Sequence, residues 1–152
     1  MEGDLLDYIG GELFARAESD DEAALLVDFA RPIPRRGALI GVGGFFIAPT
    51  GLTVSVMRPV GDRYLVIWQS PLIEIEDAGE QRERFSNPVG VEEKDVIGYD
   101  FSTSVKVSFD SGTGNKLYLQ RSLPLGAMID PSSFKWEKDK RSYPLGAFAI
   151  LE

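Results

Sequence analysis

The sequence predicts a strand-rich α+β fold in which an N-terminal helix precedes a mostly antiparallel sheet, arranged as a partly open barrel or sandwich. Sixteen Gly and nine Pro residues divide the 152-residue chain into short segments, as turns between strands do. Within these segments, for example residues 52–57, apolar and polar residues alternate. The length fits a single domain, residues 1–152, which is large enough to bury a core without disulfides.

The predicted helix comprises residues 4–17. Leu5, Ile9 and Leu13 are four positions apart and therefore share one helical face. Gly10 and Gly11 interrupt the segment, and each weakens a helix by about 1 kcal/mol relative to Ala. We therefore expect this helix to depend on tertiary packing.

Strands are predicted where apolar runs lie between turn residues. A bulge or bend is expected near Gly43 and Gly44. Leu52, Val54 and Val56 are expected on one face of their strand. The predicted strands comprise residues 24–30, 38–48, 52–57, 63–69, 72–76, 104–110, 116–122 and 147–151.

Two connections between these strands are also predicted. Residues 104–110 and 116–122 are expected to form a hairpin closed by residues 111–114, because two alternating runs flank a Gly-rich turn. Residues 78–93 are dominated by charged and turn-forming residues, so we interpret them as a mobile loop or a short helix.

The chain contains neither Cys nor His, and this excludes several chemistries. A thiolate nucleophile, a thiolate metal site and a Ser-His-Asp triad cannot be built. A carboxylate-only calcium or magnesium site stays open. We predict no cofactor, no metal site and no enzymatic activity. The lack of Cys and of a signal-peptide pattern predicts a cytoplasmic protein.

The net charge is −8, and the acidity is concentrated in the first hundred residues, which hold 9 basic and 19 acidic side chains. An acidic body argues against nucleic-acid binding, which needs a basic face. The apolar runs are too short to span a membrane. The acidity either steers a basic protein partner or serves only solubility.

Four carboxylates, Glu74, Glu76, Asp77 and Glu80, form the clearest candidate site. Glu74 and Glu76 are two apart on a predicted strand and share a face. The apolar residues around them indicate that the opposite face is buried. The four carboxylates therefore form either a solvated face or a docking surface for a basic partner.

Aromatic residues supply candidate anchors for such a partner. Trp68, Trp136 and Tyr143 are the candidates, because buried aromatic residues dominate many interfaces. Trp136 lies among the basic residues of segment 134–141, where Glu137 and Asp139 dilute the positive charge. The alternative is that Trp136 packs into the core beneath a solvated loop.

Residues 43–54, from Gly43-Gly44-Phe45-Phe46 to Leu52-Thr53-Val54, resemble the early barrel strands of trypsin-like serine proteases of the heat-shock type. The resemblance implies a similar hairpin. No His stands near Met57 and Arg58, where the family has its catalytic His, so protease activity is excluded.

Residues 117–123, Leu-Tyr-Leu-Gln-Arg-Ser-Leu, and the later Tyr143-Pro144-Leu145-Gly146 resemble immunity proteins that neutralise bacterial toxins. The resemblance implies a non-catalytic inhibitor that acts by protein–protein contact as a monomer or small homo-oligomer. Pro124-Leu125-Gly126 stands where that group has an acidic stretch. The alternative function is a structural or assembly subunit of a phage or secretion machine.

Overall fold

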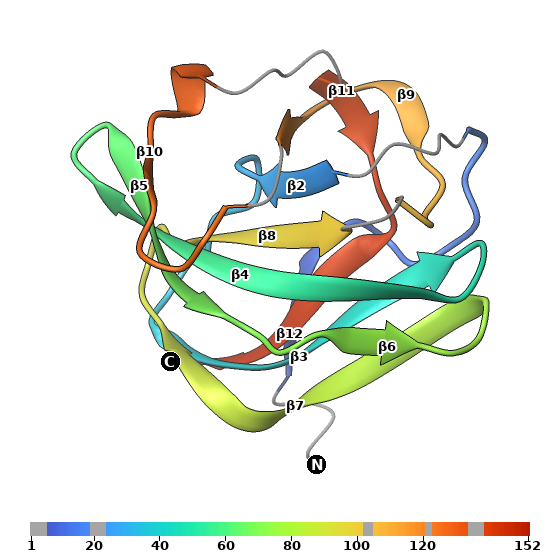
Figure 1. The fold of residues 1–152 in the computed structure, drawn as a ribbon, viewed down its shortest axis with the longest axis horizontal. Helices are drawn as coiled ribbons and strands as arrows, with labels where there is room; N and C mark the ends of the chain where they lie inside the picture. The colour runs from blue at the N-terminus through green and yellow to red at the C-terminus, as the bar shows by residue number, and fades with distance from the viewer. Residues whose placement is uncertain (1–5, 19–23, 102–104, 121–122, 134–138) are drawn as a thin grey trace.

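The computed structural model describes residues 6–18, 24–101, 105–120, 123–133 and 139–152, and nearly all of its regular structure is strand (Figure 1). The strands are β1 (Asp7–Gly10), β2 (Ala24–Asp28), β3 (Gly37–Phe46), β4 (Thr50–Val60), β5 (Arg63–Gln69), β6 (Ile73–Ile75), β7 (Gly79–Val91), β8 (Val96–Phe101), β9 (Asp110–Gln120), β10 (Met128–Ile129), β11 (Asp139–Ser142) and β12 (Leu145–Leu151). One turn of 3₁₀ helix spans Pro131–Ser133.

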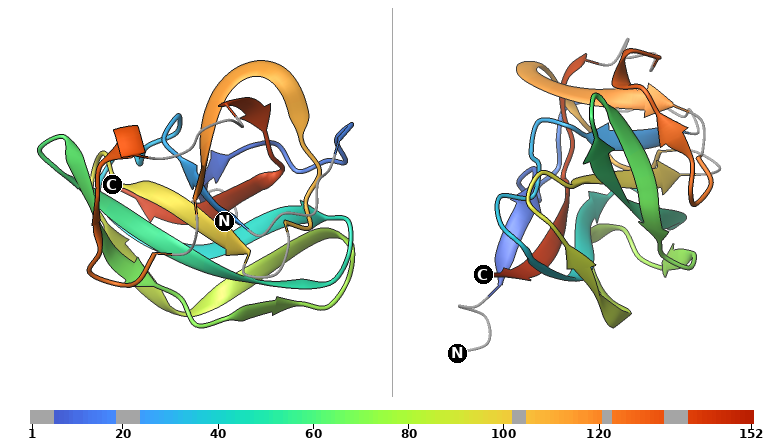
Figure 2. Two further views of the ribbon diagram at one scale, coloured as in Figure 1. Left: turned by 45° about the horizontal axis from the view of Figure 1, so that its top comes forward. Right: turned by 90° about the vertical axis from the view of Figure 1, so that its left-hand side faces the viewer.

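These strands form two antiparallel sheets that curl into a half-barrel, as the views in Figure 2 show. The smaller sheet has the order β1-β12-β3-β7. The larger sheet has the order β10-β5-β4-β8-β2-β9-β11, and β6 also pairs with β4. The prediction of a mostly antiparallel, partly open barrel or sandwich is confirmed at this level. No helix in the described part of the chain is long and apolar enough to cross a membrane.

The main core lies between the two sheets and contains the inward residues of β3, β4, β8 and β12. Leu52, Val54 and Val56 are all fully buried in it, which confirms their predicted common face. A second cluster lies on the other side of the larger sheet, where Leu123 and Ala127 cover it; its buried members are Leu25, Val27, Met57, Val66, Val96 and Ile129. The larger sheet is therefore buried on both faces over β2, β4 and β8.

The predicted N-terminal helix is wrong, since the described residues 6–18 contain β1 and an irregular segment. Gly10 and Gly11 explain the difference. A Cβ atom on Gly10 would lie 2.3 Å from the carbonyl oxygen of Leu145, and one on Gly11 would lie 2.1 Å from that of Tyr143. The two glycines thus permit a close backbone approach to the C-terminal part of the chain, and β1 pairs with β12.

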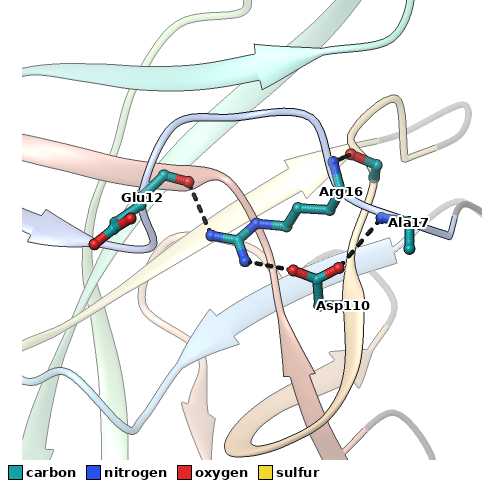
Figure 3. Close-up of polar contacts among 5 residues, drawn as sticks. Glu12, Arg16, Ala17 and Asp110 are labelled. Carbon is teal, nitrogen blue, oxygen red and sulfur yellow. Dashed lines mark hydrogen bonds and ion pairs between the residues drawn. The ribbon is translucent and has the colours of Figure 1, made fainter.

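Arg16 links the segment after β1 to the start of β9 through hydrogen bonds and an ion pair (Figure 3). Its guanidinium donates to Asp110 at 3.0 Å and to the carbonyl oxygen of Glu12 at 2.9 Å. Its backbone N–H donates to the hydroxyl of Ser108 at 2.8 Å, while its guanidinium lies 4.1 Å from the centroid of the Phe14 ring. These contacts replace the hydrogen bonds that a helix would have provided.

Replacing Gly10 by alanine is expected to lower the free energy of unfolding by about 1 to 3 kcal/mol, because the new methyl group would overlap backbone atoms that cannot rotate away. Gly90→Ala is the matched control: its added Cβ would have no neighbour within 4 Å, so we expect a change within about 0.5 kcal/mol. Urea denaturation measures both. Equal stabilities for the two variants would contradict the close approach of β1 to β12.

The predicted hairpin of residues 104–122 is also wrong over its described part, residues 105–120. Residues 110–120 form one continuous strand, β9, which pairs with β2 and with β11. The residues before it make only isolated bridges, Val107 with Phe46 and Phe109 with Glu18. Strands distant in the sequence thus form the backbone hydrogen bonds that the two arms of a local hairpin would have formed with each other.

Residues 78–93, interpreted above as a loop or short helix, contain the 13-residue strand β7. It pairs with β3, and the register shifts between Leu39 and Gly41 rather than at Gly43 and Gly44, where a bulge was expected. β7 is an edge strand, so most of its side chains are polar and exposed. That composition made the strand resemble a loop in the sequence.

The connection between β3 and β4 differs from the hairpin that the protease resemblance implied. β3 belongs to the smaller sheet and β4 to the larger one, and no ladder joins them. Residues 47–49 carry the chain from one sheet to the other. The β6–β7 connection at residues 76–78 also crosses between the two sheets (Figure 1). The site described next lies beside this connection.

Candidate functional site

Three of the four predicted carboxylates gather where β6 leads into β7. Glu74 lies on β6, Glu76 follows it, and Asp77 lies in the connection; all three are exposed. Ile75, between the two glutamates, is 3% exposed and belongs to the main core. The predicted solvent-facing position of Glu74 and Glu76 is therefore confirmed.

Glu80 lies apart from these three. It is exposed near the start of β7 and forms an ion pair with Arg82 at 3.0 Å. Both side chains line a hollow together with Tyr8 and Phe148, on strands of the smaller sheet. The guanidinium of Arg82 also lies 4.9 Å from the centroid of the Phe148 ring. Glu80 is thus part of a different surface, with its charge already balanced.

The structure does not place the predicted aromatic anchor Tyr143 at this surface. Tyr143 is 3% exposed and its ring centroid lies 5.5 Å from that of Phe109, within the main core. This burial contradicts its predicted role as a surface anchor. The N-terminal segment also covers its backbone, since a Cβ atom on Gly11 would lie 2.1 Å from the carbonyl oxygen of Tyr143. Trp136 lies outside the described residues.

Trp68, at the end of β5, is the aromatic residue that meets the carboxylates. Its side chain is half-buried, and its ring centroid lies 5.2 Å from that of Phe85 on β7. The two rings, one from each sheet, meet at a hollow of about 360 Å³. We name this hollow the acidic cleft; its lining includes Trp68, Leu72, Glu74, Glu83, Arg84 and Phe85.

Charge in and beside the acidic cleft is predominantly negative. Glu74 and Glu83 line it from β6 and β7, with Arg84 as its one cationic residue. In the described ranges, no ion pair involves Glu74, Glu76, Asp77 or Glu83. Leu72, 59% exposed, separates the cleft from a second hollow that Glu74 and Glu76 also line. The surface thus combines unpaired carboxylates with exposed apolar area.

Sequence reasoning found only part of this site. Glu74 and Trp68 were identified, but Glu83, Arg84 and Phe85 lie on β7, which was interpreted as a loop. The spacing of Phe85, Val89 and Val91 was the available signal. These residues alternate at period two and turn toward the core, as on a half-buried strand.

Two further carboxylates in the described part of the chain are buried, and each lies beside an arginine. Asp95 is fully buried and accepts hydrogen bonds from two guanidinium nitrogens of Arg58, Nε at 3.0 Å and Nη2 at 2.9 Å. Asp28 is 5% exposed and lies 3.3 Å from Arg31. Burial raises the pKa of Asp28 above its usual range, while Arg31 opposes the rise. Neither group faces the acidic cleft.

The raised pKa of Asp28 predicts a pH-dependent effect of Asp28→Asn. Because the folded state binds this proton more tightly than the unfolded state, ionisation of Asp28 weakens the fold as the pH rises through the folded pKa. Asparagine does not titrate. Relative to the wild type, the variant should therefore be more stable at pH 7 than at pH 4. Urea denaturation at both values tests this, and an unchanged difference would contradict it.

The lining of the acidic cleft combines aromatic rings with carboxylates, and this combination suits a cationic side chain. In the described ranges, the cleft included, no three Asp or Glu side chains are arranged to hold a metal ion. Comparison of the chain with protein-family models, curated proteins and solved structures finds no match.

Proposed function

We propose that the protein is a non-catalytic acidic binding protein, an inhibitor of the immunity type, that holds a basic protein partner at the acidic cleft in the cytoplasm. The observation that carries the proposal is the meeting of Glu74 and Glu83 with Trp68 and the exposed Leu72 on one surface. Carboxylates around such a site steer a basic partner into contact, and the apolar centre holds it.

The test compares two triple variants that change the net charge equally. Glu74→Gln, Glu76→Gln and Glu83→Gln neutralise the cleft, whereas the control neutralises exposed carboxylates elsewhere, namely Glu12, Asp62 and Glu93. Each protein is used as bait in lysate of the source organism at low and high salt. We expect the wild type and the control to capture one basic protein, and the cleft variant to bind it about tenfold more weakly.

Equal capture by all three proteins, with the same salt dependence, would contradict the proposal. Light scattering on the pure protein adds an independent readout. A defined large ring or polymer that captures nothing would favour an assembly subunit of a phage or secretion machine, the alternative that the sequence leaves open.

A further inference from the structure

The half-barrel is open between β6 and β7. These strands follow each other in the chain, yet no ladder joins them: β6 pairs with β4 alone, and β7 pairs with β3 alone. Both strands line the acidic cleft, so each presents an edge without a strand partner, among the described residues, to the same opening (Figure 1). Such edges are templates for another extended chain.

The opening ends at recognisable points along both strands. Ser70 and Pro71 interrupt the strand between β5 and β6, where the hydroxyl of Ser70 accepts the N–H of Val54 at 2.9 Å. On the other side, Pro88 lacks an N–H and interrupts the donors along β7. Residues 81–87 therefore offer the longest uninterrupted stretch of edge beside the cleft.

The chemistry of the cleft specifies the side chains of an added strand. Glu74 on β6 and Glu83 on β7 line it, together with the rings of Trp68 and Phe85, whose centroids are 5.2 Å apart. A lysine or arginine side chain placed there would meet carboxylates on both sides and an aromatic face below it. The exposed Leu72 at the rim would cover an apolar neighbour of that cation.

We propose that an extended basic segment of the partner protein adds as a strand to the edge of β7 at residues 81–87 and places one Lys or Arg side chain over Trp68, between Glu74 and Glu83. The inference rests on the proposed function and specifies how the partner is held. Main-chain hydrogen bonds supply affinity in this mode of binding, and the alternating side chains supply specificity.

A second copy of this chain fits the opening less well. In a two-fold antiparallel pairing of β7 centred on Glu83, this carboxylate would lie opposite that of the other copy, and in a pairing centred on Arg84 the two guanidinium groups would lie opposite each other. Like charges opposite each other across paired strands destabilise the pairing. A partner of opposite charge removes this repulsion, and charge complementarity therefore favours it.

The probe is a synthetic seven-residue peptide of alternating valine and lysine, with a backbone N-methylated twin that has the same charge. Trp136→Phe leaves Trp68 as the only tryptophan, so its fluorescence reports on the cleft. We expect the peptide to bind at least tenfold more tightly than its twin and to slow amide hydrogen exchange in residues 81–87. Glu74→Gln with Glu83→Gln should weaken binding about tenfold, and Glu12→Gln with Asp62→Asn should leave it unchanged.

Three outcomes would overturn the inference. Equal binding of peptide and twin, lost in the Glu74 and Glu83 variant, would show docking by charge without an added strand and leave the proposed function standing. No binding of either peptide, with capture from lysate still dependent on the cleft carboxylates, would also overturn the inference and leave the proposed function standing. Dimerisation of the pure protein with protection of residues 81–87 would assign the edge to a second copy.

Discussion

Replacing Asp95 by alanine is expected to lower the free energy of unfolding by about 2 to 4 kcal/mol, because it removes the buried carboxylate that accepts hydrogen bonds from the 37% exposed Arg58 side chain and from the backbone. Asp95 also accepts the N–H of Glu92 at 2.8 Å, and its own carbonyl oxygen accepts the N–H of Ile33 at 2.7 Å. The Asp95 carboxylate thus connects β4 to the segment before β8, and the Asp95 backbone connects that segment to the one before β3.

Asp95→Asn separates charge from hydrogen bonding, since its side-chain oxygen can still accept the N–H of Glu92. We expect it to cost less than Asp95→Ala and more than Asp62→Asn, whose exposed side chain makes it the control. Urea denaturation ranks the three variants. A cost for Asp95→Ala no greater than that for Asp62→Asn would show that the buried pair contributes nothing to stability.

Phe46→Ala is the second large effect, with an expected loss of about 3 to 5 kcal/mol. Phe46 is 2% exposed at the end of β3 and belongs to the main core. Its ring occupies the space beside Gly44, where a Cβ atom would lie only 2.7 Å from the ring carbon Cζ. Removal of the ring would therefore leave a cavity that the adjacent glycine has no side chain to fill.

Ile47→Ala is the matched control. Ile47 follows Phe46 in the chain, but its side chain is 44% exposed, and the substitution keeps the N–H that donates to the carbonyl oxygen of Lys106. We expect it to cost less than about 1 kcal/mol. Phe46→Leu, expected to cost roughly 1 to 1.5 kcal/mol, gives a folded comparison if the alanine variant is too unstable. Similar costs for Phe46→Ala and Ile47→Ala would contradict the packing described for this end of β3.

The sequence predicted strands well where the apolar pattern follows burial directly. Residues 52–57 alternate because one face of β4 lies in the main core, and that pattern is local. Residues 63–69 and 147–151 lie between turn residues in the same way. In such segments, the face of the strand on which each side chain lies follows from strand geometry alone.

Prediction failed where distant parts of the chain decide the structure. The i, i+4 spacing of Leu5, Ile9 and Leu13 indicates a helix. Gly10 and Gly11 instead permit the close approach of backbone atoms from residues more than a hundred positions away in the sequence. β9 contains Gly112 and Gly114, and its partners on either side of these glycines are β11, at residues 110, 111 and 116, and β2, at residues 117–120. No local pattern contains these partners.

Part of the candidate site could not be predicted from the sequence for the same reason. Glu74 was found on an alternating strand, whereas Glu83 and Phe85 lie on β7, whose exposed edge favours charged residues. Tyr143 was chosen as an anchor for its residue type alone, and the core contains it. Residue type identifies candidates for a surface, but only the fold shows which of them reach it.

The position of β12 has a consequence for the order of events during synthesis. β12 is an inner strand of the smaller sheet, between β1 and β3, so the N-terminal strand has no neighbour in that sheet until residues 145–151 leave the ribosome. Both β1 and one edge of β3 remain exposed while most of the chain is translated. Such late, long-range pairing makes folding slow and leaves unpaired strand edges open to aggregation during synthesis.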